Sequence, residues 1–315
     1  MVPNGDRLLA EVDLEPIQGQ RFQPTGFPSL GAAEFTVSRK EKSQSSILVE
    51  SAQSMANRLE RVCMNEEQNS LVPVLEALPV ITLKDTDGFV TNSILESHRM
   101  NSPYLLKKNN QLYKKINDEL DAAITRTKAI DIQKFARFVF KYDTNAILHG
   151  LFLVNHKESG GRYRLTRAIS SFIEATGSRQ AVSGGVKLDR LDPKGGDGGS
   201  KEGYGHVPYQ RIEYTAESIK AYFDIDLALI RSYGLPEAAN DFLFTFALWK
   251  IQSFLSSGLR LRTACSFKVA KPLTVTQPVN FKIPDLAILE KELSTAIQKC
   301  KHANLFCESP IIITK

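Results

Sequence analysis

The segment from 182 to 214 carries side chains suited to nucleic-acid binding. Its two ends alternate polar and apolar residues, and its centre reads PKGGDGGSKEGYG, a composition typical of flexible chain. This pattern predicts a long β-hairpin with a mobile, basic tip, and an insertion without function is the alternative. Cations bind a nucleic-acid backbone and flat rings stack on its bases, as a single strand requires. The candidate contacts here are Lys187, Arg190, Lys194, Lys201, Tyr204, His206 and Tyr209.

Residues 15–31 are a second candidate contact. This stretch, EPIQGQRFQPTGFPSLG, holds three prolines and three glycines and is therefore expected to be a loop. Its amides can form hydrogen bonds and its phenylalanines can stack on bases. The alternative is a surface loop whose phenylalanines enter the core. The candidate residues are Gln18, Arg21, Phe22 and Gln23.

A helix is expected to begin near residue 50, directly after a short apolar run at 47–49. Ser51 or Ser54 can cap it, and Met55 and Leu59 fall on one apolar face. The bare amide groups and the positive dipole end of a helix start suit phosphate, although a solvated polar face is the alternative. The candidate contacts on this helix are Ser51, Gln53, Ser54, Asn57 and Arg58.

Two pairs of arginines are spaced by two residues each. Because side chains at i and i+2 of a strand point to the same side, Arg162 and Arg164 would share one face, and Arg260 and Arg262 another. The window 258–282 also holds five basic residues and no acid, so it matches the net charge of +5 of the whole chain. A local basic patch is therefore expected in this window. For Arg162 and Arg164 the alternative is a pair of solvated arginines at a strand start.

The sequence lacks the common motifs of several catalytic and metal-binding sites. The sequence contains no P-loop, no G-x-S-x-G nucleophile elbow and no H-E-x-x-H. The five histidines are scattered: His149 lies in an apolar run typical of core, and His206 is the one candidate for a nuclease. Cys300, His302 and Cys307 lack a common zinc spacing and a fourth ligand. No metal and no cofactor are expected.

Composition limits the class of protein further. The 315 residues are 42% hydrophobic and 24% charged, values that exclude wholesale disorder. No apolar run reaches the ~18 residues that a membrane helix needs. The first 14 residues do not resemble a secretory signal, and the four cysteines form no Cys-x-x-Cys pair. Reduced thiols in a cytoplasmic protein are expected.

The candidates must be positioned by a mixed set of strands and helices. The strands predicted by alternation or by a buried apolar run are 7–14, 145–154, 165–175, 221–230 and 259–270. The predicted helices begin near 50 and span 94–100, 112–142, 238–255 and 285–299, and a DTDG turn predicts a hairpin joining 80–83 to 89–91. The order is β-α-β-β-α-β with large insertions, which indicates an α+β fold of the ferredoxin-like or RNA-recognition-motif type.

Six segments together resemble one family: IQGQRFQPTGFPSLGAA, ILVESAQSMANRLE, TNSILESHRMNSPY, AVSGGVKLDRLDP, EGYGHVPYQRIEYTAESIKAYF and GLRLRTACSF. The resemblance is to the Csb-one, or Cas-seven, subunit of type I-G (formerly I-U) CRISPR surveillance complexes. These subunits belong to the repeat-associated mysterious protein superfamily. The resemblance runs from about residue 7 to about residue 270 and so covers most of the chain.

The resemblance implies a non-enzymatic subunit shaped like a hand. The hairpin at 182–214 would be the thumb, the helical stretch at 95–142 the finger or web, and the rest of 1–315 a single palm. Several copies would stack along one CRISPR RNA and hold it for pairing with target DNA. Further implied partners are a large subunit and a Cas-five/Cas-six-like subunit. A type I assignment also implies that the hairpin residues Asp189, Asp192 and Asp197 are not catalytic.

Two other classes remain open from the sequence. A guide-processing endoribonuclease of the same superfamily would use a histidine, with His206 the candidate, and would cut repeat RNA without metal. A DNA-binding or scaffold protein that shares only the palm fold would not prefer RNA over single-stranded DNA, because only RNA has the 2′-hydroxyl.

Overall fold

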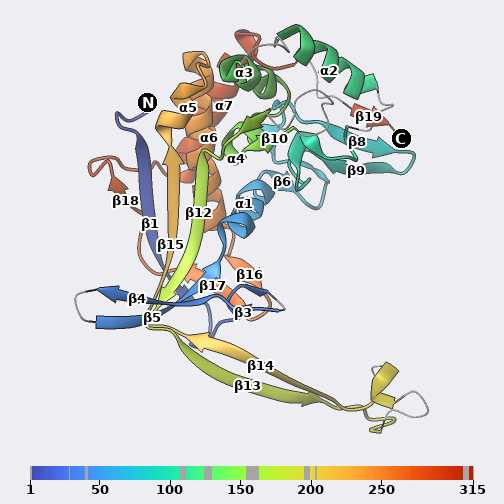
Figure 1. Ribbon diagram of the computed structural model, residues 1–315, viewed down its shortest axis with the longest axis vertical. Coiled ribbons are helices and arrows are strands. Elements are labelled where there is room, and N and C mark those ends of the chain that lie inside the picture. Colours follow the sequence, from blue (N-terminus) through green and yellow to red (C-terminus); the bar gives the residue numbers. More distant parts are fainter. Residues whose placement is uncertain are drawn as a thin grey trace.

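One antiparallel sheet organises the molecule (Figure 1). The computed structural model describes residues 2–27, 29–39, 42–106, 111–123, 130–153, 163–194, 199–202, 204–307 and 312–314. Within these residues the sheet has eight strands in the order β16-β17-β1-β15-β12-β5-β4, and β18 also pairs with β1. Its strands are β1 (Arg7–Pro16), β4 (Glu34–Arg39), β5 (Lys42–Glu50), β12 (Ile169–Thr176), β15 (Ser218–Asp226), β16 (Arg260–Arg262), β17 (Cys265–Val269) and β18 (Thr274–Gln277).

Helices gather at one end of this sheet and along one of its faces (Figure 1). They are α1 (Ala52–Arg61), α2 (Gln111–Ala123), α3 (Ile132–Tyr142), α4 (Thr144–His149), α5 (Leu227–Ser232), α6 (Glu237–Ser256) and α7 (Leu286–His302). Short 3-10 turns cover Pro73–Leu75, Arg99–Asn101 and Gly199–Glu202. The expected helices at 238–255 and 285–299 are confirmed as α6 and α7.

Smaller ribbons complete the described chain. They are β2 (Gly26–Phe27) with β3 (Gly31–Ala32), β6 (Met64–Asn65) with β7 (Ser70–Leu71), β8 (Thr82–Asp85) with β9 (Gly88–Asn92) and β19 (Ile312–Thr314), β10 (Leu151–Phe152) with β11 (Arg164–Leu165), and β13 (Arg179–Lys187) with β14 (Val207–Thr215). The predicted hairpin between 80–83 and 89–91 is confirmed as β8 and β9.

The core lies between the sheet and α6. Burial alternates along β1 and β15, so one face of each strand is buried and the other is partly exposed. Phe223 of β15 packs against Phe254 of α6, with ring centroids 6.5 Å apart. The aromatic side chains of α6, which include Phe242, Phe246 and the single tryptophan Trp249, are buried.

The opposite face of the sheet has no surplus of positive charge. Lys220 pairs with Glu11 at 2.7 Å, and Arg7 pairs with Asp226 at 3.0 Å. Lys271 likewise pairs with Asp13 of β1 at 2.9 Å. Because a polyanion needs uncompensated cations, this open face is a poor platform for an RNA backbone.

Two strand predictions were wrong where an aspartate caps a helix. The expected strand at 145–154 is instead α4 followed by β10, because the carboxylate of Asp143 accepts a hydrogen bond from the backbone amide of Ala146 at 3.0 Å. Likewise the strand predicted at 221–230 ends at Asp226, whose side chain caps α5. In each case a capping aspartate overrides the apolar pattern.

Three other predicted elements are broken. The strand expected at 259–270 is a hairpin of β16 and β17, with Ala264 in its turn at a φ of +55°. The helix predicted at 94–100 is replaced by a stretch that contains only part of the 3-10 turn at Arg99–Asn101. The helical stretch 112–142 is covered by α2 and α3, between which residues 124–129 lie outside the described residues.

Buried Asp143 should make stability depend on pH. Burial raises the pKa of its carboxyl from 3.8 to about 6, so the native state holds a proton that the unfolded state releases. Stability is then highest below the unfolded pKa and falls as pH rises through the folded pKa, and a difference of one in pKa corresponds to about 1.4 kcal/mol. We expect Asp143→Asn, which keeps the capping oxygen, to remove this fall between pH 4 and 6. Urea unfolding followed by Trp249 fluorescence checks it, and parallel pH profiles of the two proteins would contradict it.

Candidate nucleic-acid interface

A buried carboxylate joins the start of α1 to β16. The side chain of Glu50, at the end of β5, is fully buried. It accepts hydrogen bonds from the Ser54 hydroxyl and from Nε of Arg58, the latter at 3.0 Å, and forms an ion pair with Arg262. A buried charge needs such partners because burial strips it of water. The Glu50 cluster, which we define as Glu50, Ser54, Arg58 and Arg262, therefore fixes α1 against β16.

Both arginines of the Glu50 cluster have further backbone partners. Arg58 donates to the carbonyl oxygen of Leu261. Arg262 donates through Nη1 to the carbonyl oxygens of Gln23 and Val49, each at 3.0 Å. Two of the predicted RNA contacts are thus engaged in holding the fold. Their two positive charges are partly offset by Glu50, which leaves one net positive charge in the cluster.

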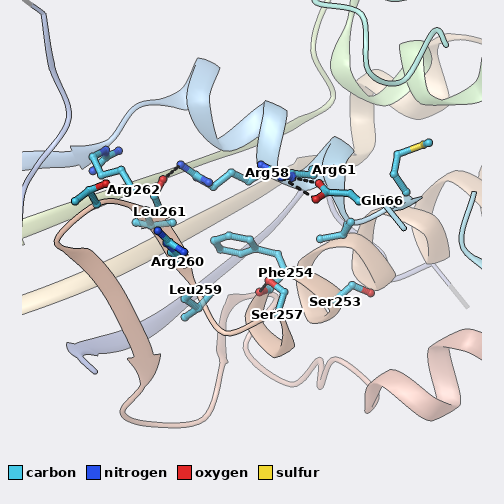
Figure 2. A pocket seen from close by; sticks show the side chains of 13 residues that line it. Arg58, Arg61, Glu66, Ser253, Phe254, Ser257, Leu259, Arg260, Leu261 and Arg262 are labelled. Atoms are coloured by element: carbon cyan, nitrogen blue, oxygen red, sulfur yellow. Dashed lines mark hydrogen bonds and ion pairs between the residues drawn. The ribbon is translucent and has the colours of Figure 1, made fainter. Parts of the chain in front are cut away.

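A groove of about 850 Å³ lies beside this cluster (Figure 2). Arginines reach into it from two elements: Arg58 and Arg61 from α1, and Arg260 and Arg262 from β16. We call it the arginine groove. Its remaining lining residues are Val62, Met64, Glu66, Ser253, Phe254, Ser257, Leu259, Leu261 and Thr263.

The arginines of this groove differ in availability. Arg61 is exposed and pairs with Glu66, whose Oε2 lies 2.9 Å from Nη2 of the arginine. Arg260 is exposed and forms no ion pair with any residue that the structure describes. The ladder shifts register between Arg260 and Arg262, so the expected common face is replaced by one exposed side chain and one directed at Glu50. Arg260 is therefore the cation most available to a phosphate.

A tight turn places Arg260 at this groove. The chain ends α6 at Ser256 and passes through Gly258 and Leu259 with φ angles of +77° and +43°. A left-handed backbone is favoured at glycine and is strained at leucine. The Leu259 side chain is buried, which compensates for that strain. The turn brings β16 back beside the last residues of α6, where Ser253 and Ser257 also line the groove.

The expected hairpin at 182–214 is present as β13 and β14, which extend away from the sheet as an arm (Figure 1). Its register gives the arm two unlike faces. Val182 pairs with Ile212 and Val186 with Pro208, which makes one face apolar. That face is open, because Val182 is 75% and Val186 55% exposed.

The second face of the arm carries Lys187, Tyr209 and Arg211. The Arg211 guanidinium lies 5.3 Å from the centre of the exposed Tyr209 ring and 3.4 Å from the carboxylate of Glu213. Lys187 is therefore the cation of this face that has no ion-pair partner in the described residues. Lys187 pairs with Val207, two residues from Tyr209 along the same face. A cation beside a flat ring is the combination that binds a single-stranded backbone and its bases. Arg211 was missed from the sequence, although its spacing of two from Tyr209 in a strand signals a common face.

The tip of the hairpin is less basic than expected. The three cations Arg190, Lys194 and Lys201 are outnumbered by the four carboxylates of the segment, which are Asp189, Asp192, Asp197 and Glu202. The positive charge of the hairpin therefore lies on the arm rather than at its tip. In the described part of the tip, the Asp189 carboxylate accepts hydrogen bonds from the backbone amides of Leu191, Asp192 and Gly205. These bonds lower the pKa of Asp189.

Four predicted contacts of the hairpin are exposed: Lys187, Arg190, Tyr204 and His206. Nδ1 of His206 accepts a hydrogen bond from the backbone amide of Asp189 at 3.0 Å. This leaves Nε2 as the ring nitrogen directed to other partners. The tip residues 195–198 and 203 lie outside the described residues.

Some predicted contacts of the loop at 15–31 are exposed, and others hold the fold together. Gln18 and Arg21 are exposed, and Arg21 lies 3.4 Å from Glu213 of β14. Phe22 is buried and its backbone bridges to Tyr214, while the amide of Gln23 donates to Ala264 at 2.8 Å. The loop thus ties the hairpin to the β16–β17 turn through buried Phe22 and through the backbone of Gln23, whose buried Oε1 has no partner in the described chain.

The predicted contacts on α1 divide in the same way. Ser51 caps the helix, as its hydroxyl oxygen accepts from the amide of Ser54 at 3.3 Å. Gln53 and Asn57 are exposed on the outer side of the helix. Of the remaining pair of arginines, Arg164 on β11 is exposed, whereas Arg162 lies outside the described residues.

The basic patch expected at 258–282 is largely neutralised, because three of its five basic residues form ion pairs. Lys268 lies 3.0 Å from Glu15, and Lys271 pairs with Asp13, both on β1. Arg262 is paired with Glu50. Within this window, Arg260 at the arginine groove and the exposed Lys282 have no ion-pair partner in the described chain.

Comparison with known proteins finds one family model, that of CRISPR-associated protein GSU0053, which matches residues 8–180. No curated protein matches the chain. Similar solved structures include two described as "CRISPR RNA-guided surveillance complex", one of them pre-nicking, and Thermofilum pendens Csc2. The pre-nicking complex has 11% identity and a TM-score of 0.37, and the match covers 94% of this chain and 89% of the other. The second complex has 12% identity and a TM-score of 0.35 (93% and 84% covered), and Csc2 has 9% and 0.34 (95% and 80%). With TM-scores below 0.5, these structures add nothing to the family match.

Among the described helices, none combines the length and apolarity that a bilayer crossing requires.

Proposed function

Because the chain belongs to the family of CRISPR-associated protein GSU0053, we propose that it is a CRISPR RNA-binding backbone subunit of a type I-G surveillance complex. The match of the family model over residues 8–180 is the observation that carries this proposal. Several copies stack along one guide and hold it for pairing with target DNA. The large subunit and a Cas-five/Cas-six-like subunit complete the assembly.

The order of elements supports a palm of the RNA-recognition-motif type within this proposal. The neighbouring strands β17-β1-β15-β12 correspond to a sheet order of 4-1-3-2, with α1 and α6 as its two packing helices. The segment with α2 and α3 is then the finger or web, and β13 and β14 form the thumb. The open face of this palm has balanced charge, so the RNA is held at α1, β16 and the arm instead.

The available cations support a grip on the RNA backbone rather than catalysis. Arg260 and the basic face of the arm offer charge and a stacking ring, which bind any sequence. The proposal assigns no reaction to the chain. Asp189 is occupied by backbone amides, which suits a role in shaping the tip.

Substituting Arg260 tests the site. We expect Arg260→Ala to weaken binding of a short RNA several-fold and to lower the slope of log K against log salt by about 0.7, the value for one phosphate contact on a single strand. Filter binding across a salt series measures both. Lys299→Ala on α7 is the matched control, because it removes the same charge from an exposed position. An unchanged slope for Arg260→Ala, or an equal change for Lys299→Ala, would place the RNA elsewhere.

The same protein preparation separates the rival functions. The proposal predicts tight binding of RNA, weaker binding of matched single-stranded DNA and no cleavage of either. Metal-free cutting of repeat RNA that stops in His206→Ala would instead identify a guide-processing endoribonuclease. Equal affinity for RNA and DNA would favour a DNA-binding or scaffold protein.

A further inference from the structure

A second basic pocket, of about 580 Å³, lies between the 3-10 turn at Arg99–Asn101 and the β10–β11 ribbon. We call it the His149 pocket. Its polar lining residues are Ser97, His98, Arg99, Asn101, His149, Arg164, Thr166 and Arg167, and Phe152 adds an aromatic ring. No carboxylate is among the described residues that line it. Its volume falls within the range of pockets that hold small ligands.

The arginines of this pocket keep a surplus of positive charge. Arg99 is neutralised by buried Glu60, which accepts from its Nε at 2.7 Å and its Nη2 at 3.1 Å. Arg167 donates to the carbonyl oxygen of Ala52 at 3.1 Å and has no ion-pair partner in the described residues. Arg164 is exposed and likewise unpaired within the described chain. Two cations are therefore available to an anion.

Two buried side chains of the pocket lack hydrogen-bond partners. His149 is only 2% exposed, and neither of its ring nitrogens has a partner in the described chain. Asn101 is 8% exposed, and its Oδ1 is likewise without a donor there. An unsatisfied buried polar group costs about 1–3 kcal/mol, so such groups are seldom kept without a use. Two of them in one basic pocket indicate a polar ligand.

The state of His149 defines what that ligand must offer. Burial, together with the charges of Lys250, Arg99 and Arg167, lowers its pKa well below the ordinary value. The ring is therefore neutral near pH 7, with one nitrogen as a donor and the other as an acceptor. Asn101 offers a further acceptor through Oδ1. A flat group with donors and acceptors along one edge satisfies both residues, and Phe152, which is 47% exposed, can stack on it.

We infer that the His149 pocket binds one nucleotide unit, with its phosphate between Arg164 and Arg167. The base stacks on Phe152 and forms hydrogen bonds with His149 and Asn101. The nucleotide is part of the RNA strand that the protein binds under the proposed function. Only this choice of source rests on the proposed function. A free nucleotide has the same chemistry, so the two sources are separated by experiment.

Of the five histidines, His98 and His149 line the pocket, so resonances of their rings report on it directly. Full-length protein with labelled histidine rings is titrated with adenosine monophosphate, inorganic phosphate and a short RNA while ring resonances are recorded. We expect the nucleotide to shift the His149 signals saturably, and phosphate alone to bind at least tenfold more weakly. Arg164→Ala, at an exposed position that should not affect folding, should weaken nucleotide binding about tenfold. Arg137→Ala, an exposed arginine on α3, is the matched control and should leave it unchanged.

Each outcome has a defined meaning. Unmoved His149 signals with the nucleotide, or equal affinities for nucleotide and phosphate, overturn the inference. Shifts with both RNA and the nucleotide support a unit of the strand, and shifts with the nucleotide alone support a free ligand. If RNA binds at the arginine groove while neither ligand moves His149, the inference fails and the proposed function stands. If the nucleotide moves His149 but no RNA binds, the proposed function fails and the pocket stands.

Discussion

Removing the Arg262 side chain is expected to lower the free energy of unfolding by about 4 kcal/mol. The substitution Arg262→Ala leaves the fully buried Glu50 with one arginine instead of two. Loss of one partner from a buried ion pair costs about 3–5 kcal/mol, because the remaining charge is stranded away from water. The carbonyl oxygens of Gln23 and Val49 lose their donor as well. Urea unfolding monitored by Trp249 fluorescence measures the change.

The neighbouring arginine provides a matched control. Arg260→Ala alters the same strand and the same charge at an exposed side chain, so its stability should stay within about 0.5 kcal/mol of the parent. Glu50→Gln should partly rescue Arg262→Ala, with a coupling energy above about 1 kcal/mol in the double-mutant cycle. Additive effects, or equal stability of the two arginine variants, would mean that the ion pair contributes little and that Arg262 is free to bind RNA.

Local patterns were sufficient to predict the elements that depend on local chemistry. The β13–β14 hairpin follows from two alternating arms around a glycine-rich centre, and α6 follows from a long apolar stretch between Pro236 and Gly258. Residue type and position predicted a cap at Ser51 or Ser54, and the structure has it at Ser51. The region of 145–154 was mispredicted because a short apolar run fits a strand and a buried helix equally well. The aspartate at 143 was the local signal that decides between them.

The roles of charged residues required the fold. Arg58 and Arg262 were predicted as RNA contacts, yet both pair with Glu50, and Arg262 is more than two hundred residues away from it in sequence. Lys268 and Lys271 belong to an acid-free window, but β1 brings acids beside them. Net charge along a segment therefore does not measure free charge on a surface, since strand pairing chooses the neighbours. Arg260 has the same local pattern as Arg262 and is set apart from it by a register shift.

The basic face of the hairpin arm is expected to contribute strongly to RNA affinity. We expect the double substitution Lys187→Ala with Tyr209→Ala to lower the affinity for a short RNA about 100-fold. Stacking of one base on an aromatic ring contributes about 1–3 kcal/mol, and the lysine adds one phosphate contact. Tyr209 is 57% exposed and Lys187 is also exposed, so the fold should keep its stability. Fluorescence anisotropy at two salt concentrations separates the stacking loss, which salt does not change, from the charge loss.

The opposite face of the same arm is the control that makes this result specific. Val182→Ala with Ile212→Ala truncates two exposed apolar side chains that pair across the hairpin and point away from Tyr209. Affinity for an RNA long enough for one copy should then stay within about twofold of the parent. Equal losses from the two double variants would indicate that RNA reads the arm as a whole, and no loss from either would remove the arm from the interface. A loss of affinity confined to the Lys187–Tyr209 face is the result expected if the RNA strand lies between the arm and the arginine groove. In that arrangement the basic face binds RNA, and the apolar face remains free for protein.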